Sequence, residues 1–218
     1  MASSRKAVSR TLVRIVAGLA LGLGCTGEPV VPHAEVPVPP GGPLPSDRAP
    51  ATSAPAPVFL TPAPDAPTVA NPVVSFWAIR GQDHTVRMYY HARAGAPDST
   101  TFAELRVRRT SLAAYPDGRP FATGDSVRIT VSLVDAERLI VELQPSGLRF
   151  SADQPARLKL SFEHTDAAAA SPQIEQTLRI WRRESANLPW TSLVSDVETG
   201  LHEVKAELSG FSGYAIAY

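Results

Sequence analysis

Alternation of apolar and polar residues is the dominant pattern between residues 73 and 218. A β-strand points successive side chains to opposite faces, so a period of two indicates antiparallel strands that cover a core on one face. The segments with this pattern are 86–91, 104–108, 127–133, 157–162, 204–208 and 214–218. In the first segment, Val86, Met88 and Tyr90 point one way and alternate with Arg87, Tyr89 and His91. A helical period is not sustained over about ten residues anywhere in this region.

Turn-forming residues separate these predicted strands. They lie at 116–118 (Pro-Asp-Gly), 123–125 (Thr-Gly-Asp), 145–147 (Pro-Ser-Gly), 152–155 (Ala-Asp-Gln-Pro) and 199–200 (Thr-Gly). Short strands at this spacing predict an all-β fold, with a single antiparallel β-sandwich over residues 73–218. A closed barrel is the weaker alternative. The region is long enough to bury one core without disulfides.

Proline dominates the segment before the predicted sandwich. Residues 26–72 contain 14 of the 21 prolines of the chain. Proline lacks an amide donor and fixes φ, and the segment has few large apolar residues to offset the entropy of ordering it. We therefore predict that residues 25–72 form a disordered Pro-rich linker. Its one apolar cluster is Val58-Phe59-Leu60.

The first 24 residues have the anatomy of a secretory signal. Basic residues without any acidic one precede an uncharged run over residues 15–24. A membrane-spanning helix needs about 20 apolar residues, so this run is a signal h-region. Cys25, the only cysteine of the chain, follows it directly. The arrangement resembles a bacterial lipoprotein signal, although Gly22 stands where that family usually has leucine.

That resemblance implies that residues 1–24 are removed and that Cys25 is lipidated. A lipoprotein cysteine carries a diacylglyceryl group and usually an N-acyl chain, such as palmitate. Each buried CH₂ contributes about 0.8 kcal/mol, and two or more chains anchor a protein stably. Thr26 follows Cys25 in place of the aspartate that retains many lipoproteins at the inner membrane. We therefore expect a protein anchored in the cell envelope, in the outer membrane of a two-membrane bacterium, facing the periplasm or the surface.

Charge and cysteine content narrow the classes of partner. The chain has 21 basic and 21 acidic residues, but four of the basic ones lie in the signal, which leaves a net charge of −4 after its removal. Because no basic stripe remains, we expect no nucleic-acid partner. A single cysteine excludes a disulfide scaffold and a thiolate metal site. The sequence contains no phosphate-binding loop, nucleophile elbow or dinucleotide fingerprint, so we expect no cofactor and no enzymatic activity.

Several stretches of the predicted sandwich resemble the ZU-type domain of zonula occludens, ankyrin and netrin-receptor proteins. They are residues 145–150 (Pro-Ser-Gly-Leu-Arg-Phe) with Pro155 and 158–160, then Leu112, 116–118 and 124–127, and finally 211–215 (Phe-Ser-Gly-Tyr-Ala). The resemblance runs from Phe102 to the end of the chain. It implies an antiparallel β-sandwich used for protein contacts, and bacterial members generally lack an assigned activity.

Some eukaryotic members of that family cleave themselves at a His-Phe-Ser tripeptide. There the serine attacks the preceding carbonyl and the histidine takes its proton. Here Gly210 precedes Phe211 and Ser212 and has no side chain that could act as the base. General-base help is worth about 10²–10⁴-fold, so we expect no autoproteolysis at this site.

A few further residues are candidates for a functional site. The stretch 164–166 (His-Thr-Asp) is the only one that looks like a polar site, and a solvated turn is the better interpretation. Glu142 and Glu163 lie on separate predicted strands, with nothing to indicate a glycosidase pair. Three tryptophans could form a stacking platform for sugars. We assign Trp181 to the core and keep Trp77 and Trp190 as candidate interaction residues.

Three functions fit these observations. The first is an envelope-anchored lipoprotein that displays a non-catalytic β-sandwich interaction module for an envelope protein. The second is a carbohydrate- or peptidoglycan-binding module, and the third a self-cleaving or hydrolytic domain. An exposed cluster of aromatic residues on one face would favour the second, whereas a smooth apolar patch at a sheet edge would favour the first.

Overall fold

The computed structural model describes residues 56–92, 100–169 and 171–218. These residues belong to one compact unit, Thr52–Tyr218. The predicted signal at residues 1–24, Cys25 and most of the predicted linker lie outside the described residues. In the described part of the chain, the helices are too short and too polar to cross a membrane.

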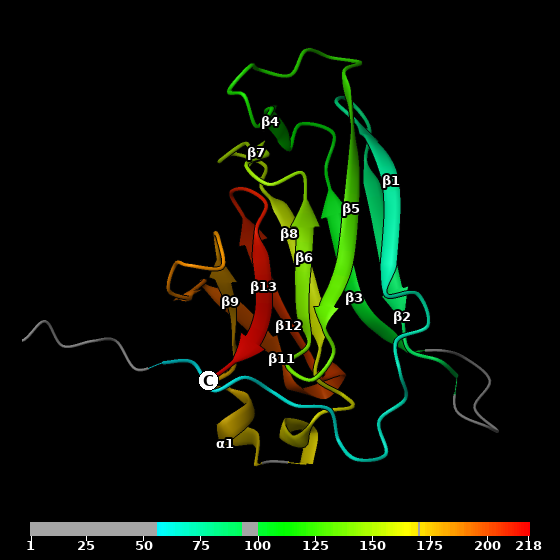
Figure 1. Cartoon of the computed structure of the whole chain (residues 1–218), viewed down its shortest axis with the longest axis vertical. Coiled ribbons are helices and arrows are strands. Elements are labelled where there is room, and N and C mark those ends of the chain that lie inside the picture. Colours follow the sequence, from blue (N-terminus) through cyan, green and yellow to red (C-terminus); the bar gives the residue numbers. More distant parts are fainter. Residues whose placement is uncertain (1–55, 93–99, 170) are drawn as a thin grey trace, which may run out of the picture. The chain divides into compact units, whose positions relative to one another are not determined.

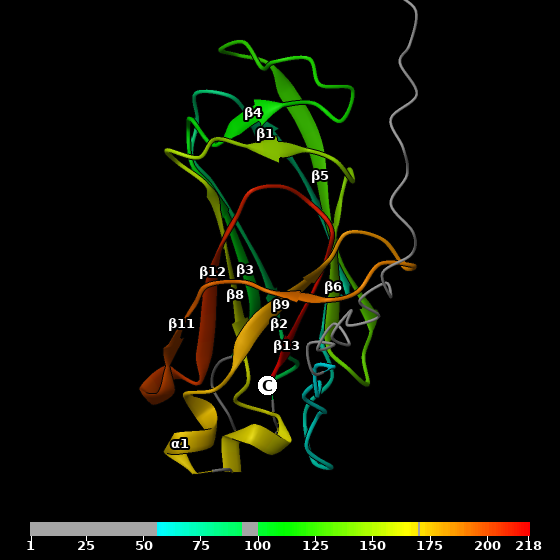
Figure 2. The same ribbon diagram turned by 90° about the vertical axis from the view of Figure 1, so that its left-hand side faces the viewer.

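Two antiparallel sheets pack face to face and form a β-sandwich (Figures 1 and 2). The six-stranded sheet has, in order, β1 (Val73–Ile79), β5 (Ser126–Asp135), β6 (Ile140–Gln144), β13 (Gly213–Ala217), β9 (Arg179–Arg183) and β10 (Thr191–Ser192). The five-stranded sheet has β11 (Ser195–Glu198), β12 (Glu203–Leu208), β8 (Ala156–Ser161), β3 (Thr101–Val107) and β2 (His84–Tyr89). The predicted all-β antiparallel sandwich is confirmed.

Short elements close the two ends of the sandwich. A two-stranded sheet of β4 (Leu112–Ala114) and β7 (Arg149–Phe150) lies at the end drawn uppermost in Figure 1. At the opposite end are the 3₁₀ helix η1 (Asp166–Ala169) and the helix α1 (Pro172–Glu175), and a second 3₁₀ turn, η2 (Thr199–Leu201), joins β11 to β12. Proline at the first position of α1 is favourable because no intrahelical donor is needed there.

The core lies between the sheets and contains the apolar positions of the alternating segments. The six-stranded sheet supplies Ile129, Val131, Val141, Leu143, Ile180, Tyr214 and Ile216, and the five-stranded sheet supplies Met88, Leu105, Leu158, Leu160, Val204 and Leu208. Each of these side chains is at most 3% exposed. The strand segments predicted from alternation therefore point their apolar residues in the predicted direction.

Residues 58–72, here called the strap, pack along the sandwich although the sequence placed them in the linker. Val58 and Leu60 continue the pairing of β13: the amide of Leu60 donates to the Ile216 carbonyl (3.2 Å) and that of Tyr218 to the Val58 carbonyl (3.1 Å). Leu60 is fully buried. The folded unit thus begins before Val73, because these residues find main-chain partners and an apolar pocket on the sandwich.

The remainder of the strap crosses the end of the sandwich to reach β1 (cyan in Figure 1). The amide of Ala63 donates to the His164 carbonyl (3.0 Å), and the amide of Ala70 donates to the Tyr89 carbonyl (2.8 Å). Val69 also forms a β-bridge with Tyr90. Proline is compatible with this course because the strap pairs through isolated bridges and not as a central strand.

Candidate functional site

The tryptophans do not form a common platform. Trp77 lies on β1, at one edge of the six-stranded sheet, and is 60% exposed. Trp190 immediately precedes β10, at the opposite edge of the same sheet, and is half-buried. Four strands separate these edges, so a single sugar ring cannot stack on both indoles.

The indole of Trp190 is engaged by the protein itself. The ring of Phe59 in the strap meets it edge-on, with centroids 5.0 Å apart. The guanidinium of Arg183 lies over the ring, 4.7 Å from its centroid, at a cation–π distance. Trp190 therefore packs between Phe59 of the strap and Arg183 of β9, and these contacts reduce the ring surface available for a ligand.

Trp181 is not a core residue, contrary to the sequence interpretation. It pairs with Ala215, while the neighbouring pair Ile180 and Ile216 faces the core. Its half-buried indole therefore lies on the outer face, where Nε1 donates to the Ala217 carbonyl (3.2 Å). The small side chains of Ala215 and Ala217 are buried on this outer face.

The stretch 164–166 holds the strap in place. The His164 ring lies edge-on to Tyr90 (4.7 Å between centroids), and its Nε2 is 3.1 Å from the Thr100 hydroxyl. The Thr165 hydroxyl is buried and donates to the Phe162 carbonyl (2.7 Å). The amide of Asp166 donates to the Thr61 carbonyl (3.1 Å). These groups are used in folding contacts, and the stretch is a clamp for the strap.

The two glutamates considered as a catalytic pair lie on different sheets. Glu142 lies on β6 of the six-stranded sheet, whereas Glu163 follows β8 of the five-stranded sheet. Among residues 56–92, 100–169 and 171–218, no three His, Cys, Asp or Glu side chains gather as metal ligands. The described residues thus do not assemble a glycosidase pair or a metal centre.

Two of the stretches that carry the ZU-type resemblance lie against each other. The amide of Phe211 donates to the Leu148 carbonyl (3.1 Å), and that of Phe150 to the Ser209 carbonyl (2.9 Å). The rings of Phe150 and Phe211 pack edge to face, with centroids 5.0 Å apart. A Cβ atom at Gly210 would lie 2.8 Å from the Leu148 carbonyl oxygen, so this close approach requires glycine.

A polar cleft of about 470 Å³ opens where these stretches meet. Its lining includes Arg149, Arg182, Glu184 and Ser209. The Arg182 guanidinium donates to the Ser212 hydroxyl (2.9 Å) and pairs with Glu184 (3.2 Å). Because Arg182 binds both Ser212 and Glu184, the cleft is a polar junction between β9 and the β12–β13 connection.

Ser212 has no general base beside it among the described residues that contact it. Its side chain is buried, and its hydroxyl accepts from Arg182, whose guanidinium is a donor and not a proton acceptor. His202 precedes β12, whereas Ser212 follows that strand, so the two lie beyond opposite ends of it. The expectation that Phe211–Ser212 is not cleaved stays a prediction.

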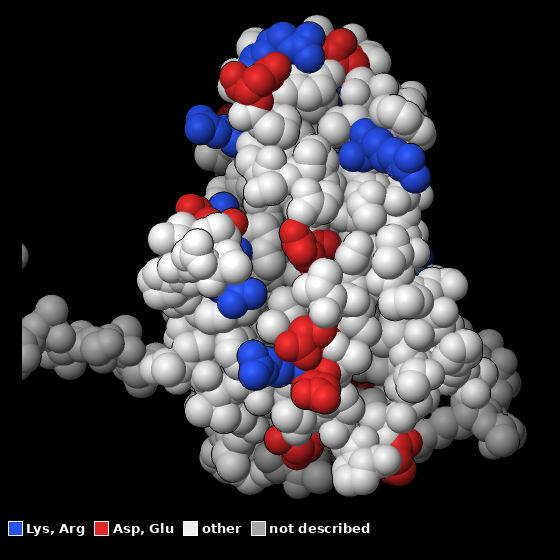
Figure 3. Space-filling view, in the orientation of Figure 1, with Lys and Arg blue, Asp and Glu red and all other residues white. Residues whose placement is uncertain are grey.

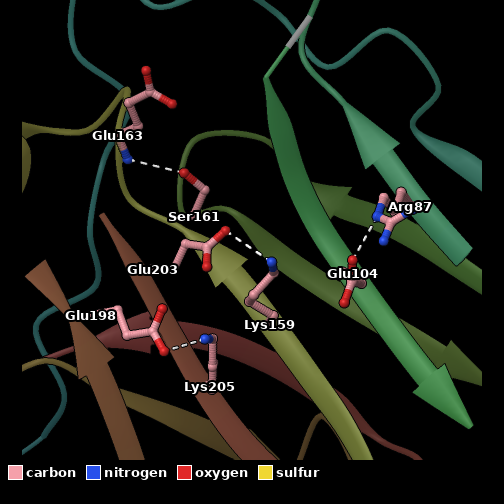
Figure 4. Close-up of polar contacts among 8 residues, drawn as sticks. All are labelled: Arg87, Glu104, Lys159, Ser161, Glu163, Glu198, Glu203 and Lys205. Carbon is pink, nitrogen blue, oxygen red and sulfur yellow. Dashed lines mark hydrogen bonds and ion pairs between the residues drawn. The ribbon is translucent and has the colours of Figure 1, made fainter. Parts of the chain in front are cut away.

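The outer face of the five-stranded sheet is covered by ion pairs. Arg87 pairs with Glu104, Lys159 with Glu203 (2.9 Å) and Lys205 with Glu198, as Figure 4 shows. Arg157 pairs with Glu207 (3.4 Å) on the same face. Each pair joins two neighbouring strands, and together the pairs involve all five strands, so basic and acidic groups neutralise each other across the face.

The outer face of the six-stranded sheet is different in character. Figure 3 views this face: uncharged residues cover most of it, and charged side chains are scattered between them. Val73 and Trp77 on β1 are each 60% exposed, and Val134 on β5 is 54% exposed. Val134 is a diagonal neighbour of Val73, because Val73 pairs with Ser132. These three residues, here called the edge patch, are exposed apolar side chains on β1 and its neighbour β5 at this edge of the sheet.

Trp77 is a candidate interaction residue from the sequence, but the alternation pattern does not show that its strand is an edge of the six-stranded sheet. The signal for that edge is the strand Val73–Ile79 itself, which has Val73 and Trp77 on its outer face and contains no charge. Comparisons with known proteins returned no matching family model, no matching curated protein and no matching solved structure.

Proposed function

We propose that this protein is a cell-envelope lipoprotein whose β-sandwich is a non-catalytic contact module. The single observation that carries the anchor is the position of Cys25, directly after a basic n-region and an uncharged h-region. Lipids on Cys25 would hold the protein in the membrane without a spanning helix. The lack of aspartate at Thr26 favours the outer membrane.

The edge patch supports the contact-module part of the proposal. An exposed apolar surface at a sheet edge is typical of a protein–protein contact. The outer face of the five-stranded sheet is a poorer contact surface, because its charged groups are paired with each other and would have to be desolvated on binding. The ZU-type resemblance agrees with a role in protein contacts.

A carbohydrate-binding module has less support from the same residues. Trp77 and Trp190 lie on opposite sheet edges, and the Trp190 ring is already covered in part by Arg183 and Phe59. A sugar would therefore meet one free indole at Trp77. A contact with an envelope protein makes better use of the edge patch as a whole.

The anchor is tested by Cys25→Ser in the native host. We expect the wild-type chain to incorporate a labelled fatty acid and to partition into detergent, and the variant to do neither. Ser212→Ala, which changes a buried hydroxyl far along the chain, is the matched control and should behave as wild type. If the Cys25→Ser chain still partitioned into detergent and carried label, the lipoprotein proposal would be wrong.

The contact surface is tested by cross-linking in isolated membranes. Trp77→Lys should reduce cross-linked products by about tenfold, since it places a charge in the edge patch. Lys159→Gln, on the opposite face, should leave them unchanged. Equal loss in both variants would contradict the assignment of the contact to the six-stranded face.

A further inference from the structure

Strand β1 is an edge without the features that usually protect one. Its seven residues, Val-Val-Ser-Phe-Trp-Ala-Ile, include no charge, proline or glycine, and they pair with β5 without a register shift. Natural edge strands are typically short, charged, bulged or covered, because an open edge is a template for another strand.

The other edges of the two large sheets have such protection in the described residues. Strand β10 has two residues, and β11 has four, including Asp196 and Glu198. Strand β2 carries Arg87 and has a bulge between Met88 and Tyr89. Strand β1 is therefore the edge best suited to pairing with a further strand.

The main-chain groups of β1 alternate in direction. The amide of Leu133 donates to the Pro72 carbonyl, and the amide of Arg80 donates to the Asp125 carbonyl. Even-numbered residues of β1 thus face β5, and odd-numbered residues face away from it. The amide of Ile79 agrees with this, because it donates outward to His84 Nε2 (3.0 Å). Val73, Ser75 and Trp77 direct their amides and carbonyls to the open edge.

We propose that two copies of the chain pair through this edge. The two β1 strands run antiparallel about a twofold axis at Ser75 and join the six-stranded sheets into one continuous sheet. Ser75 then pairs with the partner's Ser75, and Val73 pairs with the partner's Trp77. Each outward amide and carbonyl of the three residues finds a partner in this register. The inference rests on the proposed contact module but not on the lipid anchor.

The side chains fit this arrangement as well as the backbone does. Val73, Ser75 and Trp77 share the outer face, so pairing places Val73 beside the partner's Trp77 on both sides of the axis. Aromatic and β-branched cross-strand pairs are favourable. The central row contains Ser75 and Thr130, whose hydroxyls are 2.8 Å apart, and no charge. In the outer rows Arg128 lies beside Trp77, and the partner's Val73 and the partner's Ser132 continue the row. The pairing therefore brings no like charges together, which favours a second copy over a charged partner.

The interface is small, which sets the strength expected for it. Pairing of a few residues with one aromatic anchor on each side buries less than the roughly 1,200 Å² typical of stable complexes. We expect weak association in solution, with dimer populated at about 100 µM and above. Confinement on a surface would raise the effective concentration and favour the dimer.

A single cysteine at the axis tests the register in the full chain. The background is Cys25→Ser, which removes the only native cysteine and the anchor. Directly opposed residues have Cα atoms about 5.5 Å apart, within the range of a disulfide. Ser75→Cys should form a covalent dimer on mild oxidation about tenfold faster than Thr130→Cys, whose copies would lie about 15 Å apart across four strands. Equal rates, or no dimer from either, would overturn the proposal.

A second pair of variants separates edge pairing from stacking of the two apolar faces. In the Ser75→Cys background, Trp77→Lys should lower the rate about tenfold, whereas Val134→Lys, off the edge, should leave it within about twofold. Equal loss from both would indicate face stacking and overturn edge pairing. If Ser75→Cys fails to dimerise while Trp77→Lys still abolishes cross-links in membranes, the contact module stands and its partner is another protein.

Discussion

Tyr90 and Tyr214 are buried to a similar degree but differ in their hydroxyl groups. The Tyr214 hydroxyl donates to the Gly210 carbonyl. The Tyr90 hydroxyl is buried and has no hydrogen-bond partner among the described residues. A buried polar group without a partner costs about 1–3 kcal/mol, whereas a made hydrogen bond contributes about 1 kcal/mol.

We predict opposite effects from the same substitution. Tyr90→Phe should leave the free energy of unfolding unchanged or raise it by up to about 2 kcal/mol, and Tyr214→Phe should lower it by about 1 kcal/mol. Urea denaturation at neutral pH measures both. A clear loss of stability in Tyr90→Phe would show that its hydroxyl has a partner after all.

The same tyrosine gives a pH readout for the variant. Burial, and then the negative charge of Glu163, raise the pKa of Tyr90 above its ordinary value. The folded state therefore keeps the Tyr90 proton at pH values where the unfolded chain has lost it. As a result, Tyr90 does not lower the free energy of unfolding below about pH 10, and it lowers that free energy progressively as the pH rises above this value. Tyr90→Phe should make the fall in the free energy of unfolding at alkaline pH less steep. Part of the fall should remain, because burial also raises the pKa of Tyr214.

At the scale of elements, the strap is the part whose contribution is least apparent from composition. It supplies Leu60 to the core, continues the ladder of β13 and is clasped by Trp190. A Pro-rich segment normally lacks the apolar residues that offset ordering, and here Phe59 and Leu60 provide them.

We predict that Leu60→Ala lowers the free energy of unfolding by about 2–5 kcal/mol, as for other buried leucines. Val58→Ala, at a side chain that is 63% exposed, should change it by less than about 0.5 kcal/mol. A chain that begins at Val73 should lose at least as much stability as Leu60→Ala, because it lacks the whole strap. Equal stability of chains beginning at Thr52 and Val73, measured by urea denaturation, would contradict a stabilising strap.

At the scale of the folded unit, the two outer faces differ in charge. Ion pairs cover the five-stranded sheet, whereas the six-stranded face is mostly uncharged (Figures 3 and 4). Exposed ion pairs contribute little to stability, about 0–1 kcal/mol each. Their main effect is that this face carries matched charges and presents little apolar surface to a partner.

Salt therefore distinguishes which face is used for association. Raising the ionic strength from about 0.1 to 1 M shortens the Debye length from about 10 to 3 Å. We predict that the rate of Ser75→Cys cross-linking changes by less than about twofold over that range, since Ser75 and Thr130 at the axis are uncharged and Arg128, beside Trp77, has no charged group opposite it in the proposed register. The ionic-strength dependence of the cross-linking rate is the measurement. A steep fall with salt would point to the charged face instead.

The sequence by itself determined the class of fold and the strands of strongest alternation. In segments 127–133, 158–162 and 204–208, every second residue is buried in the core or packed against it, and burial on one face is the direct cause of a period of two. The glycine and proline turns between them follow from local backbone preferences, which need no distant partner. The anchor at Cys25 is likewise a local pattern, and it stays a prediction.

The tertiary structure alone decided the elements that depend on distant neighbours. The sequence of β9 does not alternate between apolar and polar residues, because Arg182 lies on the core side, where it binds Ser212. The sequence of β1 does not alternate either, because the apolar residues Val73 and Trp77 lie on its exposed face. Leu60 is ordered only because β13 offers main-chain partners and a pocket beside them. Local pattern reports the average environment of a side chain, whereas these positions are set by specific contacts between residues far apart in the chain.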